Sequence, residues 1–244
     1  MTNKARVRVN VMVAPRTIDA AAHQTLRKAA LSINKFWDNP DDHKPLLVQF
    51  KLDIKDYYYW GQFRRCCYCS SLLPSSQATW DAEHILDKSG YPEFMMELNN
   101  LAAACRPCNT GKGVRSPLIA STPKPTTIPN KSEAYRIVHP HLDDWDKYLE
   151  FDQFGRVRAK AGEAKGVNTI KLCRIEAINA ATLSDYFSLG TNKQAKEALF
   201  KFFTLKSTGV RKKYLALLDQ LATDYNMSEA KAIVERLRQE LQHP

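Results

Sequence analysis

Two Cys-x-x-Cys pairs constrain the fold of this chain more than any other feature of the sequence. The first pair is Cys66 and Cys69, and the second is Cys105 and Cys108. The two-residue gap lets both sulfurs of a pair reach one ion, and four thiolates complete the tetrahedral coordination that Zn²⁺ prefers. Such a site contributes on the order of 10 kcal/mol to folding, enough to hold a segment that could not bury a core alone. The sequence therefore predicts a closed, structural zinc site.

The other two cysteines leave one choice of ligand open. Cys67 could compete with Cys66, although the pairing through Cys66 keeps the usual gap. Five of the six cysteines lie between positions 66 and 108, and in a reducing compartment this grouping indicates metal binding rather than a disulfide framework. Cys173 is isolated in the sequence, and we expect it to be buried.

The segment that includes the cysteine pairs also carries residue types that could form a second metal site. Because a zinc ion with four thiolate ligands is saturated, metal chemistry here needs another ion. Glu83 offers a carboxylate oxygen and Asn109 an amide oxygen, and this ligand set suits Mg²⁺ or Mn²⁺ with retained waters and substrate phosphate oxygens. An unperturbed histidine titrates near neutral pH, so we expect His84 to be the general base that deprotonates a water molecule.

The charge of the chain favours an anionic partner. Its 36 Lys and Arg exceed its 26 Asp and Glu, giving a net charge of +10, which suggests nucleic acid or a membrane surface. The span 156–213 holds thirteen Lys or Arg and four Asp or Glu; a solvated helical face explains part of this excess, and a phosphate-binding surface is slightly favoured.

No apolar run approaches the roughly 20 residues that cross a bilayer, and no signal peptide is evident. We expect a cytoplasmic protein without a membrane partner.

Residues 1–62 are expected to form a strand and two helices. Four valines alternate with mostly polar residues between positions 7 and 13, which predicts a half-buried strand over 6–13. Apolar residues at three- and four-residue spacing predict a helix from Thr17, as its cap, to about residue 37. A second helix is predicted from Pro45, a favoured first helical residue, to Gly61.

An aromatic run, Tyr57-Tyr58-Tyr59-Trp60, ends this second helix. Aromatic rings of this kind can stack on unpaired bases. They can also pack against the small zinc-bearing module, and this second interpretation is favoured.

After the cysteine module (63–115), the sequence predicts a Pro-rich connector over 116–140 and a final region over 141–244. The connector contains five prolines among Ser and Thr, a composition that resists regular structure. The final region is expected to begin with a small hairpin formed by 148–151 and 156–159. Its remaining pattern predicts helices over about 169–189, 193–204, 210–225 and 229–241, the last capped by Ser228.

The central motifs, taken in order, are Cys-x-Tyr-Cys, Glu-His-Ile and Asn-Leu-x-x-x-Cys-x-x-Cys-Asn-x-x-Lys. This series resembles the HNH nuclease motif, the ββα-metal fold with a four-cysteine zinc. The resemblance implies an α+β, mainly helical chain with a ββα-metal core. It implies that His84 is the general base, that Asn100 orients the loop carrying it, and that Asn109 is a metal ligand. At the position before this base the family usually has Asp. Here it is Glu83, whose side chain is one methylene longer.

In the HNH family the reaction is phosphodiester hydrolysis, so the resemblance implies a metal-dependent endonuclease whose products carry a 5′ phosphate. DNA is the favoured substrate, and RNA is a second option. Lys112 is expected to hold a phosphate or to be an ordinary lysine at a helix terminus. The alternative is a catalytically silent subunit that binds nucleic acid through its zinc module or serves as an adaptor.

A second resemblance extends beyond the motif. Lys88-Ser89-Gly90-Tyr91, the segment 139–144 and Thr169-Ile170-x-Leu172 are similar to HNH subunits of bacterial anti-phage defence systems of the Septu and retron-associated type. The usual Leu-Asn-Arg is replaced by Leu172-Cys173-Arg174. This resemblance implies a bacterial, cytoplasmic effector beside an ATPase subunit of the ABC or SMC-like class, and in the retron type also a reverse transcriptase and its nucleic acid.

Overall fold

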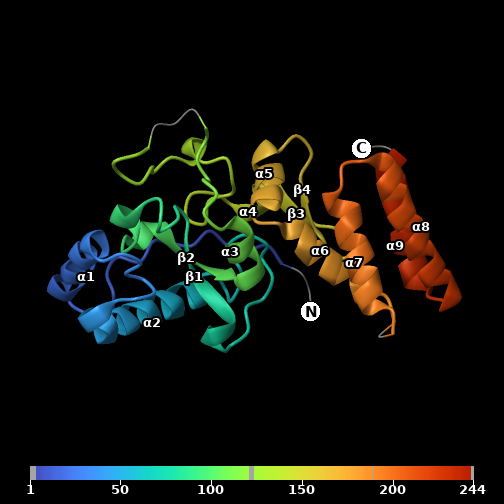
Figure 1. Cartoon of the computed structure of the whole chain (residues 1–244). Helices are drawn as coiled ribbons and strands as arrows, with labels where there is room; N and C mark the ends of the chain where they lie inside the picture. Colours follow the sequence, from blue (N-terminus) through green and yellow to red (C-terminus); the bar gives the residue numbers. More distant parts are fainter. Residues whose placement is uncertain (1–3, 121–123, 189, 243–244) are drawn as a thin grey trace. The chain divides into compact units, whose positions relative to one another are not determined.

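The computed structural model of the chain (Figure 1) describes residues 4–120, 124–188 and 190–242. The chain divides into two compact units, Met1–Glu150 with Ala159–Cys173 and Phe151–Arg158 with Arg174–Pro244. Helices and two small two-stranded sheets make the described part of the chain α+β. Across those residues, no helix is both long and apolar enough to cross a bilayer.

The strand expected over residues 6–13 is absent, and this prediction is wrong. Residues 4–12 form neither helix nor strand. Only Val9 of the four valines is buried, whereas Val13 is 96% exposed. Burial instead recurs every third residue, at Arg6, Val9 and Met12, and the Val9 amide donates to the Pro140 carbonyl at 3.3 Å. The segment is held by a loop rather than by a sheet edge, so the alternating valines have no sheet to pack on.

Two helices follow, α1 (Ala20–Ser32) and α2 (Lys44–Gly61). Helix α1 is shorter than predicted at both ends. Its cap is Asp19, whose side chain accepts from the Ala22 amide at 2.7 Å, while the Thr17 amide and hydroxyl both donate to Asp53. Helix α2 matches its prediction closely, with Pro45 in its first turn.

A strand, strand and helix follow the first cysteine pair. Strand β1 (Trp80–His84) pairs antiparallel with β2 (Leu101–Cys105), with Glu83 opposite Ala102 and His84 opposite Leu101. Helix α3 (Arg106–Lys112) begins directly after β2. Short 3-10 helices lie at Asp41–His43, Gln77–Thr79, Pro92–Phe94, Leu98–Asn100 and Ser132–Ala134.

The Pro-rich segment expected as a connector lies within the first unit, and its residues 121–123 are outside the described ranges. Leu118 and Tyr135 form an isolated antiparallel bridge. Both side chains are buried against Ile85, Leu86 and Phe94 of the loop that follows β1. The segment therefore covers the loop beside the candidate site.

The expected hairpin is present as β3 (Leu149–Phe151) and β4 (Val157–Ala159), after the short helix α4 (Trp145–Tyr148). The single helix predicted over 169–189 is instead two helices, α5 (Ala164–Leu172) and α6 (Ile175–Ser184). Arg174 between them has left-handed backbone angles (φ 51°, ψ 42°), which end a right-handed helix. Residue 189, the last of the predicted helix, is outside the described ranges.

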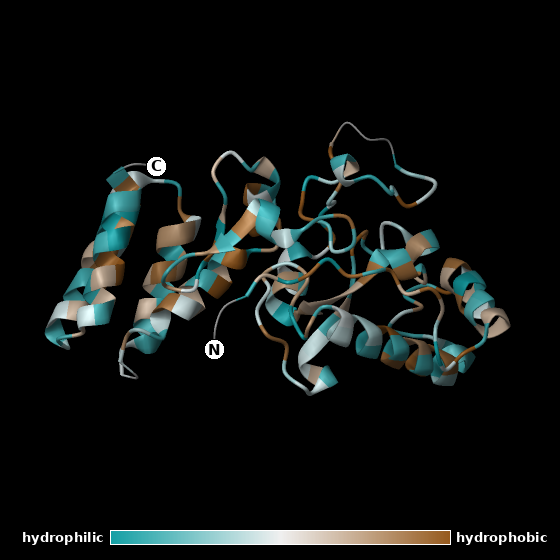
Figure 2. Ribbon diagram, turned by 180° about the vertical axis from the view of Figure 1, so that it is seen from behind, coloured by the Kyte–Doolittle hydropathy of each residue, from teal (hydrophilic) through white to brown (hydrophobic). Residues whose placement is uncertain are grey.

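Helices α6 to α9 form the core of the second unit. The last three are α7 (Asn192–Thr204), α8 (Thr208–Asp224) and α9 (Ser228–Gln242), close to the predicted ranges. Hydrophilic and hydrophobic residues are interspersed along α8 and α9 (Figure 2), as in amphipathic helices that bury one face. The buried residues of this core include Leu183, Leu199, Phe202, Leu218 and Ile233.

Candidate functional site

The four predicted zinc ligands lie together. One sulfur from each of Cys66, Cys69, Cys105 and Cys108 lies within 4.8 Å of the others, and the sulfurs of Cys69 and Cys105 are 3.7 Å apart. This donor set fits tetrahedral Zn²⁺. Cys67 is buried but lies outside the cluster, which resolves the choice of ligand in favour of Cys66.

Local structure brings the two pairs together. Cys66 and Cys69 lie on a knuckle between α2 and β1, closed by the Arg65–Leu72 bridge. Cys105 ends β2, and Cys108 lies in the first turn of α3. Burial disfavours ionisation, yet hydrogen bonds from Cys105 and Cys108 hold the pKa of the Cys66 thiol well below its usual value.

Two long-range contacts fix the knuckle from outside. The buried Arg6 guanidinium donates to the Cys67 carbonyl at 2.6 Å and to the His139 carbonyl at 3.2 Å. The Trp145 indole donates to the Tyr68 carbonyl at 2.7 Å. These donors satisfy carbonyl groups that burial would otherwise leave unpaired.

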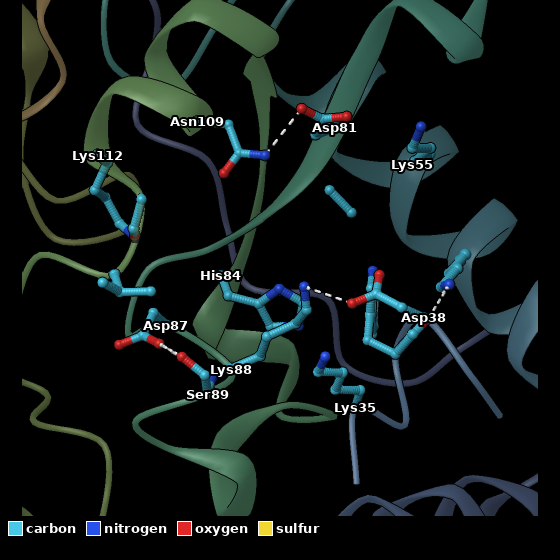
Figure 3. Close-up of a pocket in the computed structure, with 15 residues that line it drawn as sticks. Lys35, Asp38, Lys55, Asp81, His84, Asp87, Lys88, Ser89, Asn109 and Lys112 are labelled. Carbon is cyan, nitrogen blue, oxygen red and sulfur yellow. Dashed lines mark hydrogen bonds and ion pairs between the residues drawn. The ribbon is translucent and has the colours of Figure 1, made fainter.

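His84 ends β1 and lines a cleft of about 860 Å³ (Figure 3). Its Nε2 lies 3.1 Å from the Met95 carbonyl oxygen. Its ring lies edge-on to the Trp37 ring, with the ring centroids 4.4 Å apart. The pKa of His84 is lowered to about 3, first by burial and then by the nearby charge of Lys88. The imidazole is therefore neutral at physiological pH, but it is a much weaker base than the unperturbed histidine expected from the sequence.

Asn100 holds the loop that follows His84. Its side-chain NH₂ donates to the carbonyls of Leu86 (2.9 Å) and Phe94 (3.1 Å). Its side-chain oxygen accepts from the Leu86 amide at 2.8 Å, and its backbone oxygen accepts from the Ile85 amide at 2.8 Å. Asn100 is fully buried, so it positions this loop and does not reach the cleft.

Asn109 faces the cleft from α3, where its side-chain NH₂ donates to Asp81 at 2.9 Å. The two side chains point toward one another in Figure 3. Asp81 was not predicted from the sequence. Residues two apart in a strand point to the same face, so the choice of Glu83 as a site residue could also have drawn attention to Asp81.

Glu83 does not line the cleft. Its carboxylate accepts from the Lys112 ammonium at 2.8 Å and from the Tyr68 hydroxyl at 3.0 Å. Its other oxygen has no hydrogen-bond partner among the described residues. Burial raises the pKa of Glu83, and the charge of Lys112 opposes that rise. The structure thus pairs Glu83 with Lys112, and Asn109 with Asp81.

Basic side chains dominate the cleft. Its walls carry five lysines and three aspartates. Burial lowers the pKa of Lys51 and Lys55, and Lys88 is paired with Asp38 at 3.2 Å. The full set of charged lining residues besides His84 is Lys35, Lys51, Lys55, Lys88, Lys112, Asp38, Asp81 and Asp87. A net positive cleft of this size can hold an anionic substrate.

The aromatic run at the end of α2 has a mixed environment. Tyr58 and Tyr59 are buried, and Tyr59 stacks on Trp80 with ring centroids 5.3 Å apart. Trp60 is 61% exposed. Packing therefore accounts for the two central tyrosines but leaves Trp60 at the surface.

Comparison of the chain with family models, with curated proteins and with solved structures gave no match.

Proposed function

We propose that this chain is a metal-dependent HNH endonuclease that hydrolyses phosphodiester bonds of nucleic acid, with DNA favoured over RNA. The observation that carries the proposal is the environment of His84. Its imidazole lines a basic cleft, and Nε2 lies 3.1 Å from the Met95 carbonyl oxygen. This combination supports a general base acting beside a bound phosphate.

The hydrogen bond of His84 determines how it would act. Neutral imidazole has one N–H and one free lone pair. When Nε2–H donates to the Met95 carbonyl, the lone pair is on Nδ1. Nδ1 then accepts a proton from the attacking water, and the Met95 carbonyl stabilises the imidazolium that forms.

A divalent ion is part of this proposal. Asp81 and Asn109 line the cleft and carry side-chain oxygens, whereas Glu83 would have to leave its pair with Lys112 to join them. These hard donors fit Mg²⁺ or Mn²⁺, with water and phosphate completing the shell. When bound, the ion would stabilise negative charge on the phosphate and on the leaving 3′ oxygen.

The remaining residues have supporting roles in the proposal. The cleft lysines would hold the substrate backbone, Lys112 only if it left its buried pair with Glu83, and Asn100 would keep His84 in place through its loop. The zinc site would build the module without taking part in the reaction. The cellular setting, a bacterial cytoplasmic defence complex with an ABC or SMC-like ATPase and in some systems a reverse transcriptase, is proposed from the sequence resemblance alone.

The proposal is tested by replacing the base. We expect His84→Ala to reduce Mg²⁺- or Mn²⁺-dependent nicking of supercoiled plasmid by about 10²- to 10⁴-fold, the usual contribution of a general base. The matched control is His43→Ala, because His43 lies at the start of α2 and does not line the cleft. Equal nicking by wild-type and His84→Ala protein would disprove the assignment.

One observation favours a second function. Glu83, the expected metal ligand, is held by Lys112 away from the cleft. A catalytically silent nucleic-acid-binding or adaptor subunit would retain this pair permanently. That alternative predicts zinc-dependent binding to DNA or RNA that persists when Mg²⁺ is chelated, with no product from either substrate in Mg²⁺ or Mn²⁺.

A further inference from the structure

The turn between α7 and α8 carries an unusual concentration of positive charge. No acidic residue occurs between Glu197 and Asp219 in the sequence. We define the basic turn as the five cations in this interval, Lys201, Lys206, Arg211, Lys212 and Lys213. We propose that the basic turn is a second nucleic-acid surface, which binds the phosphate backbone independently of the His84 cleft. This inference rests on the proposed function in assuming that the substrate is nucleic acid.

Three of the five side chains of the basic turn are exposed to a ligand. Lys206, Lys212 and Lys213 are exposed. Within the described part of the chain, none of the five cations takes part in a salt bridge. The nearest acidic residue along α8, Asp219, is paired with Arg238 at 2.9 Å. The positive charge of the turn is therefore not neutralised within the unit.

Other basic side chains of this unit contrast with the turn. A single carboxylate, Glu240, accepts from Arg156 at 2.7 Å, Arg158 at 2.8 Å and Arg236 at 3.1 Å. Arg156 also binds Asp152 at 2.6 Å. These arginines form ion pairs within the unit, whereas the lysines of the basic turn form none among the described residues.

The turn has a defined shape. The Ser207 side chain caps α8 by accepting from the Val210 amide at 3.5 Å. Arg211 donates to the Phe202 carbonyl at 3.0 Å, and its guanidinium lies 4.5 Å from the centroid of the Phe202 ring. These contacts tie α8 to α7, so the exposed lysines extend from a fixed surface.

The positive side chains near the start of α8 are unfavourable for the stability of this helix. The N-terminus of a helix carries a partial positive charge, which favours acidic residues there. Helix α8 has no acidic residue in its first turn, and Arg211, Lys212 and Lys213 follow directly. An anionic ligand would offset this repulsion, and a phosphate backbone provides regularly spaced charges for it.

The test compares two sets of lysine substitutions that change the net charge equally. The first set is Lys206→Gln, Lys212→Gln and Lys213→Gln, in the basic turn. The control set is Lys193→Gln, Lys196→Gln and Lys231→Gln, which are also exposed and lie outside the turn in the same unit. Both sets are made in the full chain carrying His84→Ala, and far-UV circular dichroism checks that each protein is folded.

Binding to fluorescein-labelled DNA, as duplex and as single strand, is measured by anisotropy over a range of salt concentrations. We expect the basic-turn set to weaken binding at least tenfold and to lower the slope of log K against log salt by about 2 to 3, since each phosphate contact contributes about 0.7 to 0.9. The control set should change both quantities much less. Equal losses in the two sets, or no loss in the first, would overturn the proposal.

The two proposals can fail separately. Wild-type protein that binds DNA through the basic turn but yields no product would refute the nuclease while leaving this surface in place. Cleavage abolished by His84→Ala, together with unchanged binding by the basic-turn set, would refute this surface alone. In that outcome an acidic protein partner becomes the occupant to test.

Discussion

At the scale of single residues, the pairing of Glu83 with Lys112 is the feature that most affects the proposed chemistry. Both side chains are 1% exposed, and their charged atoms are 2.8 Å apart. A buried pair of this kind adds little net stability relative to apolar residues of the same size, but removing one partner leaves a buried charge. The pair therefore holds Glu83 firmly in one position.

We expect Lys112→Met to lower the free energy of unfolding by about 3 to 5 kcal/mol, because it leaves the buried Glu83 carboxylate without its charge partner. Adding Glu83→Gln to that variant should restore part of the loss. Urea denaturation measures both effects. The control is Lys124→Met, which breaks an exposed pair with Glu93 and should cost about 1 kcal/mol or less. A loss equally small for Lys112→Met would contradict the buried pair.

The burial of His139 predicts that the stability of the protein depends on pH. Its Nε2 is buried without a hydrogen-bond partner in the described structure, and burial, followed by the charges of His141, Arg6 and Lys165, holds its pKa well below 6.5. Because the folded pKa is the lower one, the stabilisation is fully present above about pH 6.5 and decreases as the pH falls below that value.

His139→Asn removes this titration and keeps an acceptor for the His141 amide, which donates to His139 Nδ1 at 3.1 Å. We expect the free energy of unfolding of the variant to fall less steeply than that of the wild type between about pH 6.5 and 4.5. Urea titrations at several pH values measure the slope. Parallel slopes for the two proteins would show that His139 is not responsible.

At the scale of elements, local sequence signals predicted the helices and hairpin well. Pro45 marked the start of α2, and apolar spacing placed α7, α8 and α9 closely. Elements that depend on distant partners were missed. The valines of 6–13 alternate like a strand, but Arg6 fixes that segment to the carbonyls of distant loops. The break at Arg174 is a left-handed residue that no Gly or Pro announces.

The candidate site shows the same division. Spacing alone selected the four cysteines that the fold brings together, since the geometry of one ion fixes the two-residue gaps. Sequence also selected His84, Asn100 and Asn109. Two further contacts depend on how α3 lies against β1. Asn109 donates a hydrogen bond to Asp81, and Lys112 forms an ion pair with Glu83. Such contacts are set by tertiary packing, which no local pattern encodes.

The loop between β1 and β2 gives an element-scale prediction. Asn100→Ala removes three side-chain hydrogen bonds that hold this loop, and unpaired buried groups cost about 1 to 3 kcal/mol each. We expect it to lower the unfolding free energy by about 2 to 4 kcal/mol and to reduce nicking. The neighbouring Asn99→Ala, at a partly exposed position, should cost less than about 0.5 kcal/mol. Equal stability of the two variants in urea would contradict this role.

At the scale of the whole molecule, the cysteine cluster lies in the first unit, and the second unit has an apolar core of its own without it. The cluster joins the knuckle after α2 to the start of α3. Loss of zinc should therefore disrupt the first unit and leave the helices of the second unit folded.

We expect one zinc ion per chain by elemental analysis of the purified protein. Cys69→Ser should lose the ion and make the first unit sensitive to protease, while Cys67→Ala should keep it, because Cys67 lies outside the cluster. Limited proteolysis with mass spectrometry identifies the surviving fragment. Retention of zinc by Cys69→Ser, or its loss from Cys67→Ala, would contradict the assigned ligands.

The central claim, that His84 accepts a proton from water, is tested most directly by chemical rescue. His84→Gly leaves space in the cleft, and added imidazole can take the place of the missing side chain as a base. Plasmid nicking in Mg²⁺ should be nearly abolished in His84→Gly and should recover in proportion to the imidazole concentration, without any effect on the wild type. Nicking by His84→Gly at the wild-type rate without imidazole would contradict the account.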